Sequence, residues 1–314
     1  IVAAGGGSAI DVAKCIKLYA PLDPAKNYLE QTAQESDIPL IAIPTTAGTG
    51  SEVTPFAVIT DEKTGEKYPL ADYELMPTMA ICDVELMLDI PPQLTANAGY
   101  DALSHAIEAA ASIMASDYTN ALALESISWL VKYLPLAFEH GRQDMVAREK
   151  VANAATMAGI AFANAFLGVC HSMAHKLGAR WHLPHGEANA LLLAEVIRFN
   201  ASKSPRKMGT FPQYAYPDAL SRYARIARTI GLNGETDEEL LEKLIEKLKE
   251  LRDRLKIPAT IKEAIGDKGT EQEFLESLEK MSRDAFDDQC TGANPRYPLV
   301  EEIKEMYRNA YYGK

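Results

Sequence analysis

Histidines are concentrated in one short stretch of this chain, Gly168–Asn189. The 314 residues contain six histidines, and four of them lie in this stretch: His171, His175, His182 and His185. His171 and His175 are four residues apart, so a helix would project both from one face, about one turn from each other. Pro184 and Gly186 flank His185, which predicts that the helix ends before it and that the chain returns on a turn.

A second pair with the same spacing, Asp101 and His105, lies upstream. A single histidine on an apolar helix is more often a core residue than a ligand, so the prediction rests on the whole set. Two helical pairs and His185 can converge on one cation. Imidazole and carboxylate ligands suit Fe(II), Zn(II), Co(II), Ni(II) or Mn(II). Five candidates exceed what a metal site open to substrate needs, so we expect His175 to be free for proton transfer.

The composition is that of an ordinary globular protein, with 47% hydrophobic and 24% charged residues. This length predicts a large core and two domains. The net charge of −12 argues against nucleic acid or an anionic membrane as a partner. No uninterrupted apolar run approaches the roughly 20 residues of a membrane span. The four separated cysteines predict thiols in a reducing compartment, hence a cytoplasmic location: Cys15, Cys82, Cys170 and Cys290.

The first residues predict a strand, a glycine turn and a helix. Ile1–Ala4 is apolar, three glycines follow, and Ser8 with Asp11 forms an S-x-x-D pattern, which predicts Ser8 as the N-cap of the helix. Such a turn points backbone N–H groups and the positive end of a helix dipole at an anion, for which a phosphate is the natural occupant. The alternative is a tight turn that only requires positive φ.

A second predicted strand, 38–44, leads into a loop rich in hydroxyl groups, Thr45–Glu52. This loop is either a solvated surface loop or a ligand-binding loop. Two loops that each follow a strand favour binding, because open α/β sheets bind ligands beyond the carboxyl ends of their strands. Further strands are predicted at 54–60, around Lys67 after a hairpin turn at 61–65, and at 79–82.

The pattern changes at Ile90-Pro91-Pro92, where strand-like alternation ends. We expect an α/β nucleotide-binding domain at 1–92 and an all-helical metal-binding domain at 93–314. The predicted helices are 99–113, 117–139, 144–165, 168–180, 186–200, 217–230, 236–256, 271–286 and 299–312.

Long ordered motifs resemble the iron-dependent (group III) alcohol dehydrogenase family. The chain is most similar to the alcohol dehydrogenase half of bacterial bifunctional aldehyde-alcohol dehydrogenases. The motifs lie at 5–14, 44–52, 67–73, 99–108, 159–189 and 284–298. The resemblance implies the dehydroquinate synthase-like, iron-containing alcohol dehydrogenase fold. In that family the dinucleotide domain begins well before the glycine turn, so 1–92 is expected to be only part of an NAD-binding, Rossmann-like parallel sheet.

The resemblance also implies the site residues. The expected ligands of Fe(II), with Zn(II) as an alternative, are Asp101, His105, His171 and His185. His175 is implied as a proton relay near substrate and nicotinamide. The expected pyrophosphate-binding turn consists of Gly6, Gly7, Ser8 and Asp11. The residues expected to line the NAD dinucleotide are Thr45, Thr46, Thr54 and Lys67.

The implied activity is reversible hydride transfer between NAD(H) and a short-chain primary alcohol or aldehyde, with ethanol and acetaldehyde as the expected pair. The alternatives are a Zn-dependent glycerol, diol or butanol dehydrogenase of the same fold, or a mainly structural assembly module of a filamentous aldehyde-alcohol dehydrogenase. A homo-oligomer is expected, possibly within a longer bifunctional chain.

Overall fold

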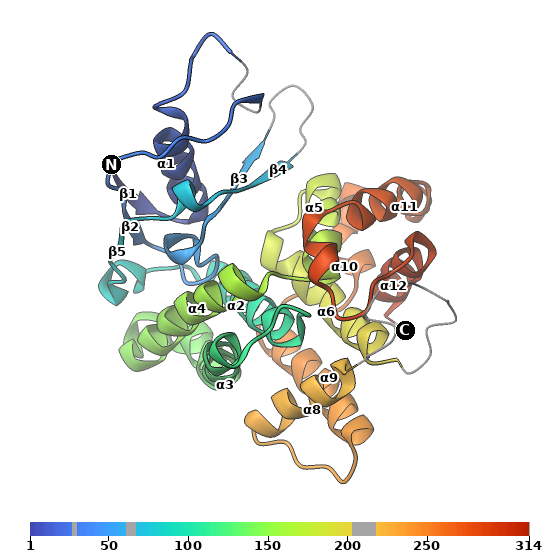
Figure 1. The fold of residues 1–314 in the computed structure, drawn as a ribbon. Coiled ribbons are helices and arrows are strands. Elements are labelled where there is room, and N and C mark those ends of the chain that lie inside the picture. Colours follow the sequence, from blue (N-terminus) through green and yellow to red (C-terminus); the bar gives the residue numbers. More distant parts are fainter. Residues whose placement is uncertain (27–29, 61–66, 203–217, 314) are drawn as a thin grey trace.

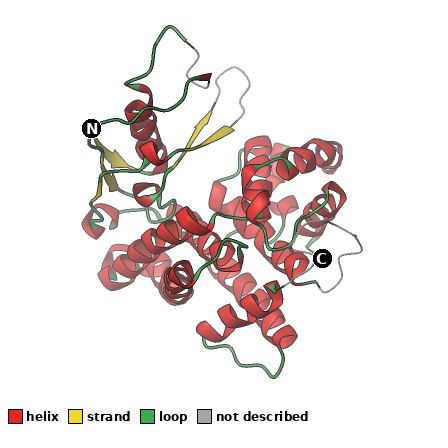
Figure 2. Ribbon diagram, in the orientation of Figure 1, coloured by secondary structure: helices red, strands yellow, loops and turns green. Residues whose placement is uncertain are grey.

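The computed structural model describes residues 1–26, 30–60, 67–202 and 218–313. All of its strands lie in the first part of the chain, and the described elements from residue 92 onward are helical (Figures 1 and 2). The predicted fold class, an α/β part followed by an all-helical part, is confirmed. The division into domains at residue 92 stays a prediction, although a helix does begin at Pro92.

A small parallel sheet has the strand order β1-β2-β5, formed by Val2–Gly5, Ile41–Pro44 and Met79–Ala80. In its register Gly5 lies opposite Pro44, so β1 and β2 end at the same edge of the sheet. The glycine turn after β1 and the hydroxyl-rich loop after β2 are therefore neighbours. Strands β3 (Phe56–Thr60) and β4 (Lys67–Ala71) form a separate antiparallel pair. The predicted hairpin turn at 61–65 lies outside the described residues.

The first helix, α1 (Gly7–Tyr19), does not start as predicted. Its N-cap is Gly6 rather than Ser8, and no side chain caps it. The carboxylate of Asp11 reaches away from the helix: Oδ1 accepts a hydrogen bond from Ser51 Oγ at 2.6 Å, and Oδ2 accepts one from the N–H of Val58 at 3.0 Å. Asp11 thus joins α1 to the loop after β2 and to β3. Because the helix starts at Gly7, Asp11 lies beyond the first turn and does not cap it.

The helical part is built around α2, which packs against α3, α4 and α6 (Figure 1). Most of α2 is buried, and its many alanines, together with Gly99, allow neighbouring helices to come close. The helices are α2 (Pro92–Ala111), α3 (Asp117–His140), α4 (Met145–Ala165), α5 (Val169–Trp181), α6 (His185–Ala201), α8 (Ala219–Thr229), α9 (Asp237–Arg254), α10 (Ile261–Ile265), α11 (Glu271–Phe286) and α12 (Val300–Tyr312).

The predicted helices agree with these bounds within a few residues, with two exceptions. The helix predicted from 99 begins at Pro92, because proline is favoured in the first turn, where its missing N–H is not needed. The five-residue α10 was not predicted. The segment Asp117–Gln143 is long and apolar enough to cross a membrane, but α3 packs in the core against α2 and α4, and core helices commonly share this composition.

Candidate functional site

Helix α2 presents Asp101, His105 and Glu108 toward the N-terminal ends of α5 and α6. The contact with α6 depends on Gly186, where an added Cβ would lie 1.8 Å from the backbone oxygen of Asn97 in α2. Only glycine permits this approach. It brings His185, the first residue of α6, to 3.5 Å from Asp101, measured from Nε2 to Oδ1.

A second close approach places α5. At Gly168, the N-cap of α5, an added Cβ would lie 2.7 Å from Glu108 Oε1. Glu108 Oε1 accepts a hydrogen bond from the N–H of Cys170 at 2.9 Å, and Asn294 Oδ1 accepts one from the N–H of Val169 at 3.1 Å. These side chains satisfy two of the free N–H groups that begin every helix. The other oxygen of Glu108 is hydrogen-bonded to Nδ1 of His171, which leaves Nε2 of His171 facing Asp101.

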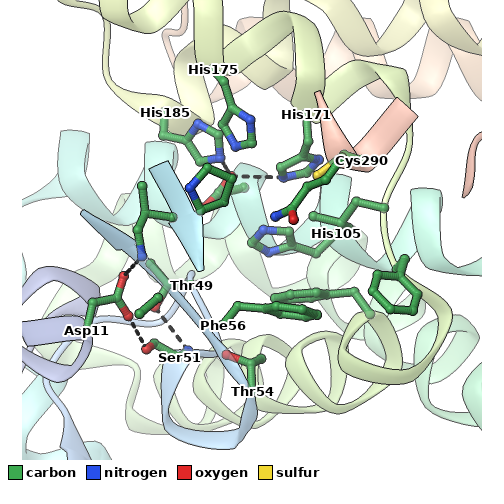
Figure 3. A pocket seen from close by; sticks show the side chains of 18 residues that line it. Asp11, Thr49, Ser51, Thr54, Phe56, His105, His171, His175, His185 and Cys290 are labelled. Atoms are coloured by element: carbon green, nitrogen blue, oxygen red, sulfur yellow. Dashed lines mark hydrogen bonds and ion pairs between the residues drawn. The ribbon is translucent and has the colours of Figure 1, made fainter. Parts of the chain in front are cut away.

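Asp101, His105, His171 and His185 therefore meet in one place, although they come from three helices (Figure 3). One potential ligand atom from each lies within 4.8 Å of those of the others. His171 Nε2 is 3.8 Å from Asp101 Oδ1, and the ring centroids of His105 and His171 are 4.6 Å apart. Asp101 and His105 thus lie together as their spacing predicted, whereas of the pair His171 and His175 only His171 belongs to this group. That they bind a metal stays a prediction.

The polar environment of this cluster fits a cation. The amide nitrogen of Asn189 lies 2.8 Å from Asp101 Oδ1, 3.1 Å from His171 Nε2 and 3.5 Å from His185 Nε2. Three ligand atoms thus already converge on one electropositive group. Nδ1 of His105 is buried and has no hydrogen-bond partner among the described residues. Three nitrogens and one carboxylate form a donor set that suits Fe(II) or Zn(II).

Charge and burial set the protonation of these ligands. Burial lowers the pKa of His105 to about 4, so this imidazole is neutral at pH 7. Burial alone would raise the pKa of Asp101, but the imidazoles of His185, His105 and His171 hold it below its ordinary value. In His171, burial would lower the pKa, but Glu108 and Asp101 outweigh it and raise the pKa to about 9. A carboxylate behind a ligating imidazole is a common means of orienting it.

His175 lies one helical turn beyond His171 and does not join the cluster. Its ring centroid is 5.3 Å from that of His185, and its Nδ1 is 3.0 Å from Oδ2 of Asp288. His175, Asp288 and Cys290 form a second group of potential metal ligands. The ammonium group of Lys176 already contacts the same carboxylate oxygen at 2.8 Å. The structure therefore keeps His175 apart from the four clustered residues, as the sequence led us to expect.

A cavity of about 210 Å³ connects this cluster to the N-terminal part of the chain (Figure 3). His171, His175 and His185 line one side, and Asp11, Thr49, Ser51 and Thr54 line the opposite side. Much of the remaining wall is apolar and is formed by Phe56, Ala57, Val58, Pro69, Phe162, Phe166 and Leu167. The cavity thus joins a polar region, an apolar wall and the histidine cluster.

Phe166, which is part of this wall, has an unusual backbone conformation. It is the C-cap of α4, with φ 59° and ψ −175°, a region that is essentially limited to glycine. Its ring lies 5.9 Å from that of Phe56, and its side chain is 43% exposed. The strained residue sits between α4 and α5 at the point where the chain turns toward His171.

The residues predicted to bind the dinucleotide fall into two groups. Asp11 and Thr54 line the cavity. Gly6, Gly7, Ser8, Thr45 and Thr46 do not line it, but they form the two neighbouring loops beyond β1 and β2. An added Cβ at Gly7 would lie 2.8 Å from Thr49 Cγ2, and the N–H of Thr45 donates to the carbonyl oxygen of Gly5 at 2.9 Å.

Three residues, Thr54, Lys67 and His182, each have a specific position. The backbone oxygen and Oγ1 of Thr54 accept hydrogen bonds from the buried Lys14 at 2.8 and 3.2 Å, so Thr54 also anchors α1. Lys67 begins β4, but the structure does not describe its side chain. His182 is exposed and is the C-cap of α5, in the left-handed conformation.

The sequence did not identify Glu108, Asn189 or Asp288 as part of the site. Glu108 had a detectable signal, because it lies seven residues after Asp101 and three after His105 and therefore shares their helical face. Asn189 likewise lies four residues after His185 in α6. Asp288 had no such signal, since 113 residues separate it from His175.

Comparison with known proteins agrees with this geometry. Residues 95–311 match the family described as "Fe-containing alcohol dehydrogenase family, C-terminal", and residues 1–84 match "Iron-containing alcohol dehydrogenase". The bifunctional aldehyde-alcohol dehydrogenase of Escherichia coli K12 is 49% identical over 331 residues, which are 100% of this chain and 37% of that enzyme. The NADPH-dependent butanol dehydrogenase of Clostridium saccharobutylicum is 43% identical over 319 residues, 100% of this chain and 76% of that protein.

Solved structures have the same fold. An iron-containing alcohol dehydrogenase from Thermococcus thioreducens superposes with a TM-score of 0.86 at 38% identity, covering 100% of this chain and 77% of that one. Sulfoacetaldehyde reductase from Bifidobacterium kashiwanohense, solved in complex with NAD+, gives a TM-score of 0.82 at 29% identity, covering 100% and 76%. From its sequence matches, its fold and its cluster of one aspartate and three histidines, this chain belongs to the iron-containing alcohol dehydrogenase family.

Proposed function

We propose that this chain carries a metal-dependent alcohol dehydrogenase and aldehyde reductase activity, with reversible hydride transfer between NAD(H) and a short-chain primary alcohol or aldehyde. The observation that supports it most directly is the position of the four-residue cluster on the wall of a cavity whose opposite side is formed by Asp11 of α1 and by Thr49, Ser51 and Thr54, which follow β2. A ligand held by those loops would face the cluster across the cavity.

The proposed metal ligands are Asp101, His105, His171 and His185, with Fe(II) as the expected ion and Zn(II) as the alternative. When bound, such an ion acts as a Lewis acid, which polarises a carbonyl oxygen and lowers the pKa of an alcohol. Glu108 orients His171 through its hydrogen bond to Nδ1. His175 is the proposed proton carrier, because it reaches the same cavity without belonging to the cluster.

The proposed cofactor is NAD(H), positioned by the loops that contain Gly6, Gly7, Ser8, Thr45 and Thr46 and by Asp11, Thr54 and Lys67. The NAD+ complex of the related sulfoacetaldehyde reductase supports this proposal. The related butanol dehydrogenase is named as NADPH-dependent, so the two cofactors have to be compared directly. Measuring the rates with NADH and NADPH under equal conditions decides between them.

The apolar wall supports a small apolar substrate, and the similarity to aldehyde-alcohol dehydrogenases favours ethanol and acetaldehyde. A zinc-dependent glycerol or diol dehydrogenase would require polar groups in the wall for the additional hydroxyl group. The chain spans little more than a third of the E. coli relative, so we propose that it can act within a longer bifunctional chain. A cytoplasmic homo-oligomer is part of the same proposal, and a mainly structural role in a filamentous assembly is the alternative.

Two substitutions test the proposed roles. His185→Ala should lose bound metal and turnover together, because it removes a ligand. His175→Ala should keep its metal and lose about 100-fold or more in kcat, because general acid–base groups contribute about 10²–10⁴-fold. Metal content by elemental analysis and acetaldehyde-dependent oxidation of NADH, with added Fe(II) under anaerobic conditions, measure both. Full activity with bound metal in both variants would refute the assignment, and electron microscopy for polymers addresses the structural alternative.

A further inference from the structure

Asp288 is a buried carboxylate that lies directly behind His175, on the side away from the cavity. Its side chain is only 2% exposed, and both of its oxygens are used. Oδ1 caps the short helix η7 (Gln289–Ala293) by accepting the N–H of Cys290 at 3.1 Å, and Ser172 Oγ lies 3.4 Å away. Oδ2 contacts His175 Nδ1 at 3.0 Å and Lys176 Nζ at 2.8 Å.

The two oxygens of Asp288 have separate tasks. Capping η7 requires one acceptor, and Oδ1 supplies it. Oδ2 has no part in that cap, yet it is buried with an imidazole and an ammonium group as its partners. Burial would raise the pKa of Asp288, but the hydrogen bond and charge of His175 and the charge of Lys176 lower it, so the group is an anion at neutral pH. An ionised carboxylate can only accept, so Nδ1 of His175 carries the hydrogen.

The same arrangement occurs twice on α5. His171 has its Nδ1 on Glu108, and His175, one turn later, has its Nδ1 on Asp288. In both residues the carboxylate leaves Nε2 as the free nitrogen. His171 directs Nε2 to the metal-ligand cluster, whereas His175 lines the cavity that we propose for the substrate. The difference lies in where each imidazole points and not in how it is held.

We propose that Asp288 is a positioning residue for the reaction: it holds the His175 imidazole in the tautomer and orientation that present Nε2 to the bound alcohol or aldehyde. Lys176 holds the same carboxylate oxygen in place. This inference rests on the proposed function, since it assigns Asp288 a role through the proposed proton carrier. It requires no contact between Asp288 and the substrate, the cofactor or the metal.

Asp288→Asn is the decisive variant, because it separates the two tasks. The asparagine Oδ1 can still cap η7, which directs the amide NH₂ toward His175 and Lys176. Nδ1 of His175 must then accept, so its hydrogen moves to Nε2, and the free nitrogen no longer faces the cavity. The fold and the metal should be retained. kcat should fall by about 10- to 100-fold or more, with KM for the alcohol changed by less than about twofold.

Epistasis between Asp288 and His175 distinguishes a positioning role from a purely structural one, because a purely structural role of Asp288 would not depend on His175. In a His175→Ala background, Asp288→Asn should cause no further loss of kcat, because there is no imidazole left to position. Asp287→Asn is the matched control, since the neighbouring carboxylate is exposed and should be neutral when changed. If Asp288→Asn does not fold, Asp288→Ser keeps a capping oxygen and removes the contact with His175, and the same epistasis is expected.

Two outcomes would overturn the proposal. Equal losses from Asp288→Asn in the wild-type and His175→Ala backgrounds would show that Asp288 acts independently of His175. Loss of bound metal in Asp288→Asn would show that it supports the cluster instead. Failure of the proposed function is distinguishable, because the wild-type protein would then lack alcohol-dependent reduction of NAD+ and every variant would be equally inactive.

Discussion

Gly186 determines whether the two halves of the proposed metal site can meet. A Cβ at this position would lie 1.8 Å from the backbone oxygen of Asn97, whereas ordinary contacts begin near 3.4 Å. Both partners are backbone groups of packed helices, so no flexible side chain can yield. Gly186→Ala must therefore push the start of α6 away from α2 by a large part of that difference. His185 precedes the substituted residue and moves with it.

The expected loss of metal follows from this displacement. Metal–ligand distances vary by only about 0.2 Å, so a shift of an ångström or more removes His185 from the ligand set. We expect Gly186→Ala to lower metal occupancy at least tenfold and to lower the free energy of unfolding by about 1–3 kcal/mol, as overpacked cores do. Elemental analysis after chelator dialysis, followed by urea unfolding of the metal-free protein, measures the two effects separately.

Gly292→Ala is the matched control, because an added Cβ there meets nothing within 4 Å and its φ is not positive. It should keep both metal and stability. If Gly186→Ala binds metal as tightly as the wild-type protein and unfolds at the same urea concentration, the close contact between α2 and α6 does not position His185, and the reasoning fails.

Two further predictions concern protonation and strain. Despite its burial, Glu108 and Asp101 raise the pKa of His171 to about 9, so below pH 9 a metal must displace a proton from this imidazole. The apparent affinity for Zn(II), measured against a competing chelator, should rise by up to about tenfold per pH unit between pH 7 and 9 and level off above pH 9. Glu108→Gln should make this dependence on pH weaker. An affinity of the wild-type protein that does not change with pH would contradict this. The free energy of unfolding in urea should be about 1–3 kcal/mol higher for Phe166→Gly than for Phe166→Ala, because glycine adopts φ 59° without strain. Equal stability of the two variants would show that the backbone at this position relaxes.

The sequence could predict which candidate side chains share a helical face, because this information is local. Asp101 and His105, like His171 and His175, are four residues apart, and helical periodicity alone places each pair on one face. The packing of α2 against α5 and α6 is not local. It depends on Gly168 and Gly186, whose spacing does not indicate that another helix approaches them within contact distance.

Other features could not be predicted for the same reason. The S-x-x-D pattern at Ser8 and Asp11 predicted a capped helix, but the carboxylate of Asp11 accepts hydrogen bonds from Ser51 and Val58, which lie 40 and 47 residues later in the chain. Asp288 reaches His175 only because the chain returns to α5 after α11, 113 residues later. The backbone conformation of Phe166 follows from the sharp turn between α4 and α5. A phenylalanine in the sequence does not indicate such a conformation.

The burial of α2 has a consequence for how the family can diversify. A helix that is enclosed along most of its length and also carries two proposed ligands and Glu108 tolerates few substitutions, since almost any change alters packing and donor geometry together. In the proposed enzyme, we expect changes of substrate preference to arise in the apolar wall of the cavity, where Val58, Pro69 and Phe166 come from separate segments. Chemistry and selectivity are thereby encoded in different parts of the chain, and selectivity can evolve without disturbing the reaction centre.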